Sequence, residues 1–174
     1  MLTNRTALKL SLYPDSILRK KTRLVNEFND ELRRILKEMA QIMYINKGVG
    51  LAANQVGLDL SILVADAGEG IYKLVNPKIV YRRGRETLEE GCLSLPNICV
   101  KVKRAKKIIV NALDEYGKTF SIEADGLLGR IFQHEIDHLN GKLIIDYATF
   151  FEKIKIKSEL KKINKKNFDE RLCK

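Results

Sequence analysis

The sequence predicts a mixed fold in which a run of strands lies between helices, and the helix after the strands carries a metal-binding motif. Apolar residues repeat with helical spacing after Asn29 and again within residues 127–139, which predicts two amphipathic helices. Between these segments, residues 60–123 hold short stretches rich in branched side chains, as strands do. Residues 149–172 add a lysine-rich helical segment.

The composition is that of a soluble globular protein. The 174 residues suit one domain over residues 1–174 with a core of its own. No segment approaches the ~20 apolar residues that span a bilayer, and the N-terminus lacks an apolar run with a cleavage site. Three cysteines, an odd number, argue against a disulfide framework. We therefore expect a cytoplasmic protein with reduced thiols.

The formal net charge of +10 is large for a chain of this size. Such a charge suits contact with nucleic acid, an anionic membrane face or a ribosome. A general bias of the genome toward lysine would produce the same charge. Charge alone therefore does not choose between these explanations.

The N-terminal part is expected to form an arm followed by a helix. Residues 1–25 carry scattered apolar positions and a turn signal at Tyr13-Pro14-Asp15, which predicts an extended arm that wraps onto the body. Asn29 is a favourable N-cap before a strong helical pattern. The apolar positions of that pattern are Leu32, Ile35, Leu36, Met39, Ile42 and Met43. The helix is expected to end just before Gly48.

The glycine-rich segment that follows, GVGLAANQVG, occupies residues 48–57. A phosphate-binding loop is excluded because no Gly-Lys-Ser/Thr follows, and the glycine spacing does not fit a dinucleotide-binding fingerprint. Small residues let a backbone approach a ligand closely, although an ordinary flexible loop has the same composition. Asn54 and Gln55 are the side-chain amides here that could polarise a carbonyl group.

Strands are expected at residues 60–65, 72–75, 78–82 and 100–102 because these segments are short and rich in branched residues. A hairpin is expected further on. Residues 107–113 and 118–122 flank the sequence DEYG, which is typical of a hairpin turn.

The stretch QHEIDHLNG contains both histidines of the chain, His134 and His138. On a helix, the i, i+4 spacing places the two imidazoles on one face, where both can reach one metal ion. Glu135 projects beside that face, where a carboxylate can accept a proton from water on the metal. The motif also arises by chance, but apolar residues with helical spacing surround it, and residues 124–126 and Gly141 supply a start and a stop.

A third metal ligand must come from elsewhere, because no third histidine exists. The soft candidates are Cys92, Cys99 and Cys173. A free cysteine is most often a small buried apolar residue. Cys92 differs because a glycine precedes it and a proline follows shortly after, which indicates a tight, exposed turn. With the two histidines it would complete a Cys-His-His set that leaves a fourth position open for water.

These residues together resemble the peptide deformylase family, which is recognised by three motifs. All three stand here in the family's order: GVGLAANQ at 48–55, EGCLS at 90–94 and QHEIDHL at 133–139. The resemblance extends through Tyr13-Pro14-Asp15 and residues 123–126, and covers roughly residues 8–147. One motif alone would be weak, whereas three in order are specific.

The resemblance implies an α+β fold in which β-sheets surround the helix that carries the two histidines, with an N-terminal and a C-terminal helix in addition. It implies an enzyme that removes formyl from the N-terminal formyl-methionine of nascent polypeptides and releases formate. We expect this enzyme to be a monomer. The implied cofactor is Fe(II), one per chain, which Ni, Co or Zn can replace. The basic helix at 149–172 resembles the element by which some bacterial members dock on the ribosome, although an ordinary solvated helix has the same composition. No membrane partner is implied.

The resemblance also assigns roles to residues. Cys92, His134 and His138 are the implied metal ligands, and Glu135 is the implied general base and acid. The side chain of Gln55 and the backbone N–H of Leu93 would stabilise the oxyanion. The expected substrate-binding residues are Val49, Gly50, Leu51, Gly91, Leu127, Arg130 and Ile131. Among them, Val49 to Leu51 are expected to pair their backbone with the peptide, and the residues from 127 to 131 to line a methionine pocket.

Two positions depart from the family pattern. Cys99 stands where many members carry an arginine at the mouth of the peptide groove, and Lys101 or Lys103 is a candidate to replace it. Lys47 is often acidic in relatives. These departures concern peptide anchoring and leave the chemistry untouched.

Two other functions share part of this pattern. A metalloprotease has the same His-Glu-x-x-His motif but takes a third histidine or glutamate at a downstream spacing that is not seen here. A basic RNA- or ribosome-binding module could keep the fold without activity. It would then need to have lost a ligand, the glutamate or Gln55, and the sequence retains all of them.

Overall fold

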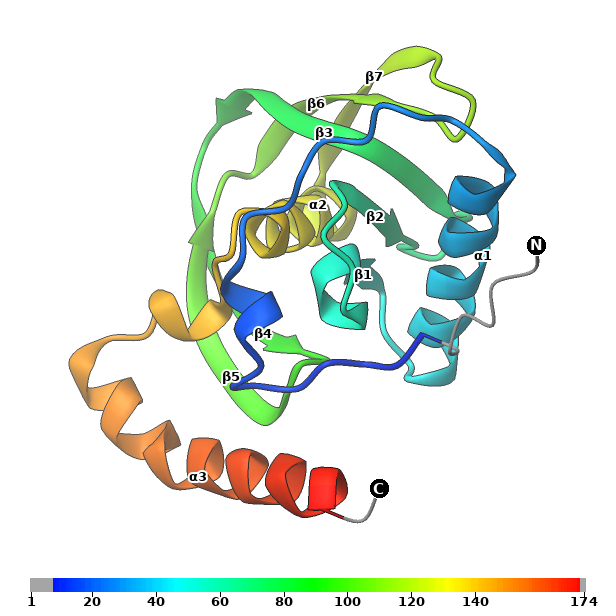
Figure 1. The fold of residues 1–174 in the computed structure, drawn as a ribbon. Helices are drawn as coiled ribbons and strands as arrows, with labels where there is room; N and C mark the ends of the chain where they lie inside the picture. Colours follow the sequence, from blue (N-terminus) through cyan, green and yellow to red (C-terminus); the bar gives the residue numbers. More distant parts are fainter. Residues whose placement is uncertain (1–7, 173–174) are drawn as a thin grey trace.

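The computed structural model describes the backbone of residues 8–172 and the side chains of residues 8–163. Helix α2 (Gly126–Leu139) lies near the middle of the molecule, with strands on several sides of it (Figure 1). Helix α1 (Asp30–Ile45) lies on one side and α3 (Phe150–Leu172) projects along another (Figure 1). The expected α+β fold around a histidine-bearing helix is therefore confirmed. Cys173 lies outside the described residues.

Five strands form an antiparallel sheet in the order β1-β2-β3-β6-β7. These strands are β1 (Gly50–Ala52), β2 (Ile62–Ala65), β3 (Tyr72–Arg83), β6 (Lys107–Leu113) and β7 (Thr119–Asp125). The short strand β1 stands at the edge of this sheet and begins inside the glycine-rich segment. That segment is therefore an ordered edge strand followed by the short 3-10 helix η2 (Ala53–Val56).

Strand β3 covers two segments that the sequence analysis separated. Its register against β6 shifts between Val75 and Lys78 and again between Ile79 and Tyr81. Asn76 has a φ of 52°, and Pro77 follows it. A proline and a left-handed residue favour a break, but the chain absorbs them as bulges within one strand.

A separate two-stranded sheet contains β4 (Glu86–Cys92) and β5 (Leu95–Arg104). Only the middle of β5, residues 100–102, was predicted from the sequence, and β4 was not predicted. Most β4 side chains are exposed, so the strand lacks the apolar alternation by which a half-buried strand is recognised. Cys92 ends β4, and the chain turns there into β5.

Helix α1 has the predicted start and face. The side chain of Asn29 accepts a hydrogen bond from the backbone N–H of Leu32 at 3.0 Å and so caps the helix. The buried positions Leu32, Ile35, Leu36, Met39 and Met43 share one face, which packs against β1 and β2. Packing against α1 therefore holds the edge strand β1 in position.

Helix α2 also begins and ends where the sequence predicted. Asp125 precedes its first turn, and Asn140 ends it. Gly141 has a φ of 73°, and a Cβ there would lie 2.3 Å from the carbonyl oxygen of Arg19. Only glycine fits this close approach, so it both stops the helix and lets the N-terminal segment pack against its end.

The N-terminal segment lies against the elements that carry the motifs. The backbone N–H groups of Ser11 and Tyr13 donate to the carbonyls of Gln55 and Ser94 at 2.7 Å and 3.0 Å. The N–H of Thr22 donates to the carbonyl of Leu139 at 2.9 Å. The predicted arm is therefore seen from residue 8 onward, with the short 3-10 helix η1 (Ser16–Arg19) inside it.

Helix α3 starts with an exposed apolar group and then packs against the body. Phe150 and Phe151 are each 74% exposed. Further along, Ile163 is 7% exposed and packs, with Ile156 and Leu160, in the core cluster that holds the inner side of β5. The composition of residues 149–172 also suits an ordinary solvated helix, but the inner face of α3 is buried. Across the described helices, none combines the length and the apolar character that crossing a bilayer requires.

Candidate functional site

The three predicted metal ligands meet in space. Cys92 comes from the end of β4, whereas His134 and His138 lie one turn apart on α2. One ligand atom from each lies within 4.8 Å of the others. The Sγ atom of Cys92 is 3.2 Å from Nε2 of His138, and the centroids of the two imidazole rings are 5.0 Å apart. In the described part of the chain this is the one group with the geometry of a metal site.

The orientation of His134 is set by Glu90. Its Nδ1 donates to Oε2 of Glu90 at 3.0 Å, which leaves Nε2 as the nitrogen that can bind a metal. Burial raises the pKa of Glu90, but hydrogen bonds from His134 and Arg104 outweigh burial and lower it to about 2. The carboxylate is therefore ionised and acts as an acceptor. Burial lowers the pKa of His138 well below its usual value, which keeps that ring neutral, as metal binding requires.

Two arginines hold Glu90 in place. Arg104 donates to it from both Nε and NH2 at 2.9 Å, and Arg130 donates from NH1 at 2.7 Å. Arg130 also donates to the carbonyl of Val102 at 3.1 Å. All three side chains are nearly fully buried, and their charges are paired. A buried, multiply bonded carboxylate of this kind is a rigid support for the ligand ring.

Glu135 is 4% exposed and lies beside the ligands. Burial raises its pKa to about 7, although the positive charges of His134 and Arg104 oppose this. Its Oε2 atom is buried without a hydrogen-bond partner among the described residues. Such an atom requires a donor, and water in the site is the donor that this position offers.

The residues present fit a divalent transition metal. Thiolate and imidazole are the ligands that iron, nickel, cobalt and zinc accept. Three protein ligands leave a position open, as catalytic rather than structural metal sites do. The unpartnered oxygen of Glu135 next to that position is the observation that separates this site from a closed, structural one.

Gln55 points into the site, whereas its neighbour Asn54 does not. The side-chain Oε1 of Gln55 accepts from the backbone N–H of Ala52 at 2.8 Å, which fixes the amide. Its Nε2 is 3.6 Å from Sγ of Cys92 and 3.3 Å from Oγ of Ser94. Asn54 instead donates to the backbone carbonyl of His138 and supports the end of α2.

A cleft of about 400 Å³ opens onto these residues. Its walls include the candidate residues Val49, Gly50, Gln55, Gly91, Cys92, Leu93, Leu127, Arg130, Ile131, His134 and Glu135. Leu51 is fully buried in the core against α1, so only its backbone faces outward. The guanidinium of Arg130 is committed to Glu90 and to carbonyl groups, which leaves mainly the stem of this side chain for a ligand.

The lysines suggested as substitutes at Cys99 do not reach this cleft. Cys99 is exposed on β5 opposite Gly91, but neither Lys101 nor Lys103 lines the cleft that holds the metal ligands. Lys103 lines a different cleft, and Lys47 lines this one. The surface lysine that lines the site cleft is therefore Lys47, in the loop between α1 and β1.

The hydrogen bonds that hold Glu90 in place could not be predicted from the sequence. Glu90 stands within a recognised motif, but its partners Arg104, Arg130 and His134 are 14, 40 and 44 positions away. No local pattern indicates such pairs. A buried charge in a mostly exposed strand becomes recognisable only when the fold brings its partners together.

Comparison with known proteins identifies a matching family and close relatives in sequence. The family model of polypeptide deformylase matches residues 7–153. The peptide deformylase of Thermoanaerobacter pseudethanolicus is 49% identical over 149 residues, which cover 86% of this chain and 94% of the relative. That of Thermoanaerobacter sp. strain X514 is 52% identical over 137 residues, or 79% of this chain and 82% of the relative.

Solved structures that resemble this chain are also peptide deformylases. A crystal structure of a peptide deformylase from Legionella pneumophila has a TM-score of 0.87 at 39% identity and covers 93% of this chain and 98% of its own. The structure of peptide deformylase from Thermus thermophilus has a TM-score of 0.85 at 38% identity and covers 90% and 97%. The likeness therefore includes the fold and nearly the full length of these chains.

Proposed function

This chain belongs to the peptide deformylase family and is a metal-dependent hydrolase that removes N-formyl groups from peptides, and we propose that Glu135, Gln55 and Leu93 perform this reaction at the metal site. The observation that carries the proposal is the buried, unpartnered oxygen of Glu135 beside the Cys92, His134 and His138 ligands.

Cys92, His134 and His138 would hold the metal. When bound, a divalent metal supplies Lewis acidity and lowers the pKa of water in the open position. Glu90 keeps the Nδ1 proton of His134 in place, so that Nε2 remains available for ligation. We propose Fe(II) as the metal, with nickel, cobalt or zinc as substitutes, because the soft thiolate and two imidazoles suit this group of ions.

Glu135 acts as general base and then as general acid. Its Oε2 accepts the proton of the attacking water, because that oxygen has no other partner within the described protein. The same oxygen then returns the proton to the amine that leaves when the C–N bond of the formyl amide breaks. Burial keeps competing water away from the carboxylate and holds it in one position.

Gln55 and Leu93 bind the negative charge that develops on the formyl oxygen. The amide of Gln55 is fixed at its oxygen by Ala52. Its Nε2 atom lies 3.6 Å from Sγ of Cys92 and 3.3 Å from Oγ of Ser94, and we propose that one of its N–H groups turns to the formyl oxygen. The backbone N–H of Leu93, in the turn after Cys92, is the second donor that we propose. Loss of one such donor costs roughly 10²–10³ in rate.

The formylated peptide binds along the edge of β1. Because β1 ends the five-stranded sheet, one side of its backbone is open to an added strand. The carbonyl of Val49 accepts from the N–H of Asp66 at 2.9 Å, so we propose that the peptide pairs at Val49 to Leu51 through the backbone groups that β2 does not use. Gly91 borders the opposite wall of the cleft. We propose that Leu127, Ile131 and the stem of Arg130 line a pocket for the first side chain, and that this side chain is methionine, whose flexible thioether suits an apolar pocket.

A wider set of proposals concerns the cellular setting. We propose that the substrates are nascent chains with N-terminal formyl-methionine, that the enzyme is a cytoplasmic monomer, and that residues 1–174 act as one domain. The exposed lysines of α3, namely Lys153, Lys155, Lys157, Lys161 and Lys162, support a further proposal that this helix contacts the ribosome. Binding through those lysines would weaken steeply with salt, because each neutralised phosphate releases counterions.

Formate release from a short formyl-methionyl peptide tests the mechanism. Protein purified without oxygen is expected to contain one metal per chain and to release formate. Glu135→Gln should keep the metal and lower turnover by about 10² or more, because an amide cannot accept the proton. Cys92→Ser should lose the metal itself, because a hydroxyl is a poor substitute for thiolate. A Glu135→Gln protein with activity within about tenfold of wild type would refute the role of Glu135.

A further inference from the structure

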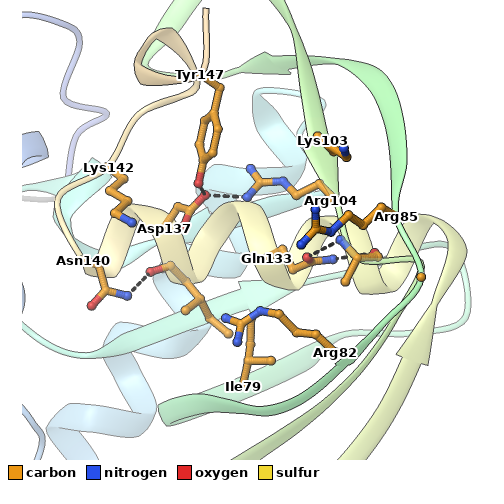
Figure 2. Close-up of a pocket in the computed structure, with 13 residues that line it drawn as sticks. Ile79, Arg82, Arg85, Lys103, Arg104, Gln133, Asp137, Asn140, Lys142 and Tyr147 are labelled. Carbon is orange, nitrogen blue, oxygen red and sulfur yellow. Dashed lines mark hydrogen bonds and ion pairs between the residues drawn. The ribbon is translucent and has the colours of Figure 1, made fainter.

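A second cleft lies on another face of α2, away from the metal ligands. Its volume is about 1040 Å³, compared with about 400 Å³ for the cleft at the metal site. It is enclosed by β3, the β3–β4 turn, the end of β5, the last turns of α2 and the loop that follows α2 (Figure 2). None of the proposed steps of deformylation uses this cleft.

Cationic side chains dominate its walls. Arg82, Arg85, Lys103 and Lys142 are exposed, and within the described residues none of the four makes an ion pair or a side-chain hydrogen bond. Basic side chains elsewhere, such as Lys37 and Lys118, also make no ion pair among the described residues, so the lack of a partner is not special to this cleft. What distinguishes the four cations is that they line one hollow together.

The single carboxylate in the cleft does not balance these charges. Asp137 accepts hydrogen bonds from Arg104 and, at 2.7 Å, from the hydroxyl of Tyr147 (Figure 2). Arg104 is only 6% exposed and is also bound to Glu90. The floor of the cleft is therefore a rigid, internally paired network, and the four unpaired cations determine the field above it.

Phosphate groups are the anions that this arrangement matches. Guanidinium groups bind phosphate oxygens with two parallel hydrogen bonds, and lysines add point charges. The cations come from separate elements and surround the hollow, with Arg82 on one side and Arg85 and Lys103 on another (Figure 2). Such an arrangement fits a compact ligand with several charges, whereas an extended nucleic-acid backbone requires a continuous track of cations.

We propose that this cleft binds a compact ligand with two or more linked phosphate groups, of the nucleoside polyphosphate or inorganic polyphosphate class. The volume of the cleft is at the upper end of small-molecule sites. Tyr147 stands at the rim of the cleft and is 38% exposed. The guanidinium carbon of Arg104 lies 5.2 Å from the centroid of its ring, and the ring is a planar surface on which a base can stack. Ile79 and Ile136 provide the small apolar part of the wall.

Calorimetric titration of the full-length protein with tripolyphosphate and with ATP, at about 0.1 M salt, tests this proposal. Saturable binding of one ligand per chain is expected for at least one of the two. The double variant Arg82→Gln, Arg85→Gln should weaken binding at least about tenfold, because it removes two guanidinium groups that form charge-assisted hydrogen bonds with phosphate. A matched variant with the same charge change, Lys37→Gln, Lys118→Gln, should weaken it by less than about threefold. Both double variants should release formate as the wild type does, which shows that they are folded.

The two ligand sources give different results. If ATP binds more tightly than tripolyphosphate, and Tyr147→Leu abolishes this difference in affinity, the ligand is a nucleotide. Equal affinities for the two identify inorganic polyphosphate. Equal losses in the two double variants would overturn the proposal, because binding would then follow net charge alone. Binding of single-stranded RNA without binding of either small ligand would also overturn it.

Discussion

Glu135 depends on Gly50 for its space. A Cβ at position 50 would lie 2.5 Å from Oε1 of Glu135 and 2.7 Å from a methyl carbon of Ile131. Both distances are shorter than ordinary side-chain contacts, so the carboxylate of Glu135 would have to move from its observed position. A glycine in the edge strand is therefore what lets the backbone of β1 and the carboxylate lie side by side.

Gly50→Ala is expected to lower formate release by about 10²-fold through displacement of the Glu135 carboxylate, since errors of about 1 Å at a reacting group have effects of that size. Metal content should remain unchanged because the atoms nearest to a Cβ at residue 50 belong to Glu135 and Ile131, which are not ligands. Steady-state assays with metal analysis on the same sample check both points. Activity within about twofold of wild type would show that Glu135 does not need its observed position.

At the scale of elements, the N-terminal segment is tied to the turn before β2 by Asp59. Its carboxylate accepts from the backbone N–H and Nε of Arg23 at 3.1 Å and 3.0 Å, and it pairs with Lys20 at 2.6 Å. The hydrogen bond from Lys20 is the main cause that lowers the pKa of Asp59. The lowered pKa means that the ionised carboxylate stabilises the folded state.

Asp59→Asn should lower the urea midpoint of unfolding at pH 7. Because the pKa of Asp59 is lower in the folded protein, its stabilising effect is present above the unfolded value of about 3.9 and is lost as pH falls through the folded value. The difference between variant and wild type should therefore shrink below about pH 4. Glu69→Gln is the control, because Glu69 is exposed and makes no ion pair or side-chain hydrogen bond within the described residues. It should show no such pH-dependent difference. A constant deficit from pH 7 to pH 3 would mean that the charge of Asp59 is not the cause.

The inner and outer faces of helix α3 can be tested separately. Its inner residue Ile163 is buried against the β5 cluster, whereas Ile154 is 56% exposed on the same helix. Ile163→Ala should reduce the free energy of unfolding by about 2 kcal/mol, and Ile154→Ala by less than about 0.5 kcal/mol. Urea denaturation measures both. Equal effects would show that α3 does not pack on β5 in solution.

Ribosome binding by α3 is therefore better tested by removing charge than by removing the helix. A truncation after Glu152 also deletes Ile156, Leu160 and Ile163 from the core cluster, so it would change stability and binding together. Replacing the exposed lysines by glutamine leaves the inner face intact. Co-sedimentation with ribosomes should then fall, while hydrolysis of a short peptide stays close to wild type. Unchanged sedimentation would contradict a ribosomal role for these lysines.

For the whole molecule, the metal site connects two parts of the fold. Cys92 belongs to the two-stranded sheet, while the histidines belong to α2, which packs on the five-stranded sheet. Removal of the metal by a chelator should lower the melting temperature by about 10 °C, because a ligand at 10²–10³ times its Kd contributes about 3–4 kcal/mol. Scanning calorimetry before and after chelation checks this. Cys92→Ser should show almost no response to added metal, and a full response there would exclude Cys92 as a ligand.

Sequence reasoning recovered what is local and missed what depends on distant contacts. The ligand pair and Glu135 could be found because their spacing along one helix fixes their arrangement. Helix α1 could be found from its cap and its apolar face. Strand β4 could not, because its exposed side chains carry no alternation. The pairing of Glu90 with Arg104 depends on the sheet register, and the docking of Ile163 depends on a surface that exists only after folding.

The separation of Cys92 and His138 by 46 positions has a consequence for the life of the protein in the cell. A bond through the metal closes a loop of that length, and cross-links of this kind stabilise proteins by about 3–4 kcal/mol. Newly made chains that have not acquired metal would open the β4–β5 hairpin more often and be degraded sooner, because proteases act on transiently opened forms. The abundance of the protein should therefore follow the supply of metal, with degradation removing the molecules that cannot work.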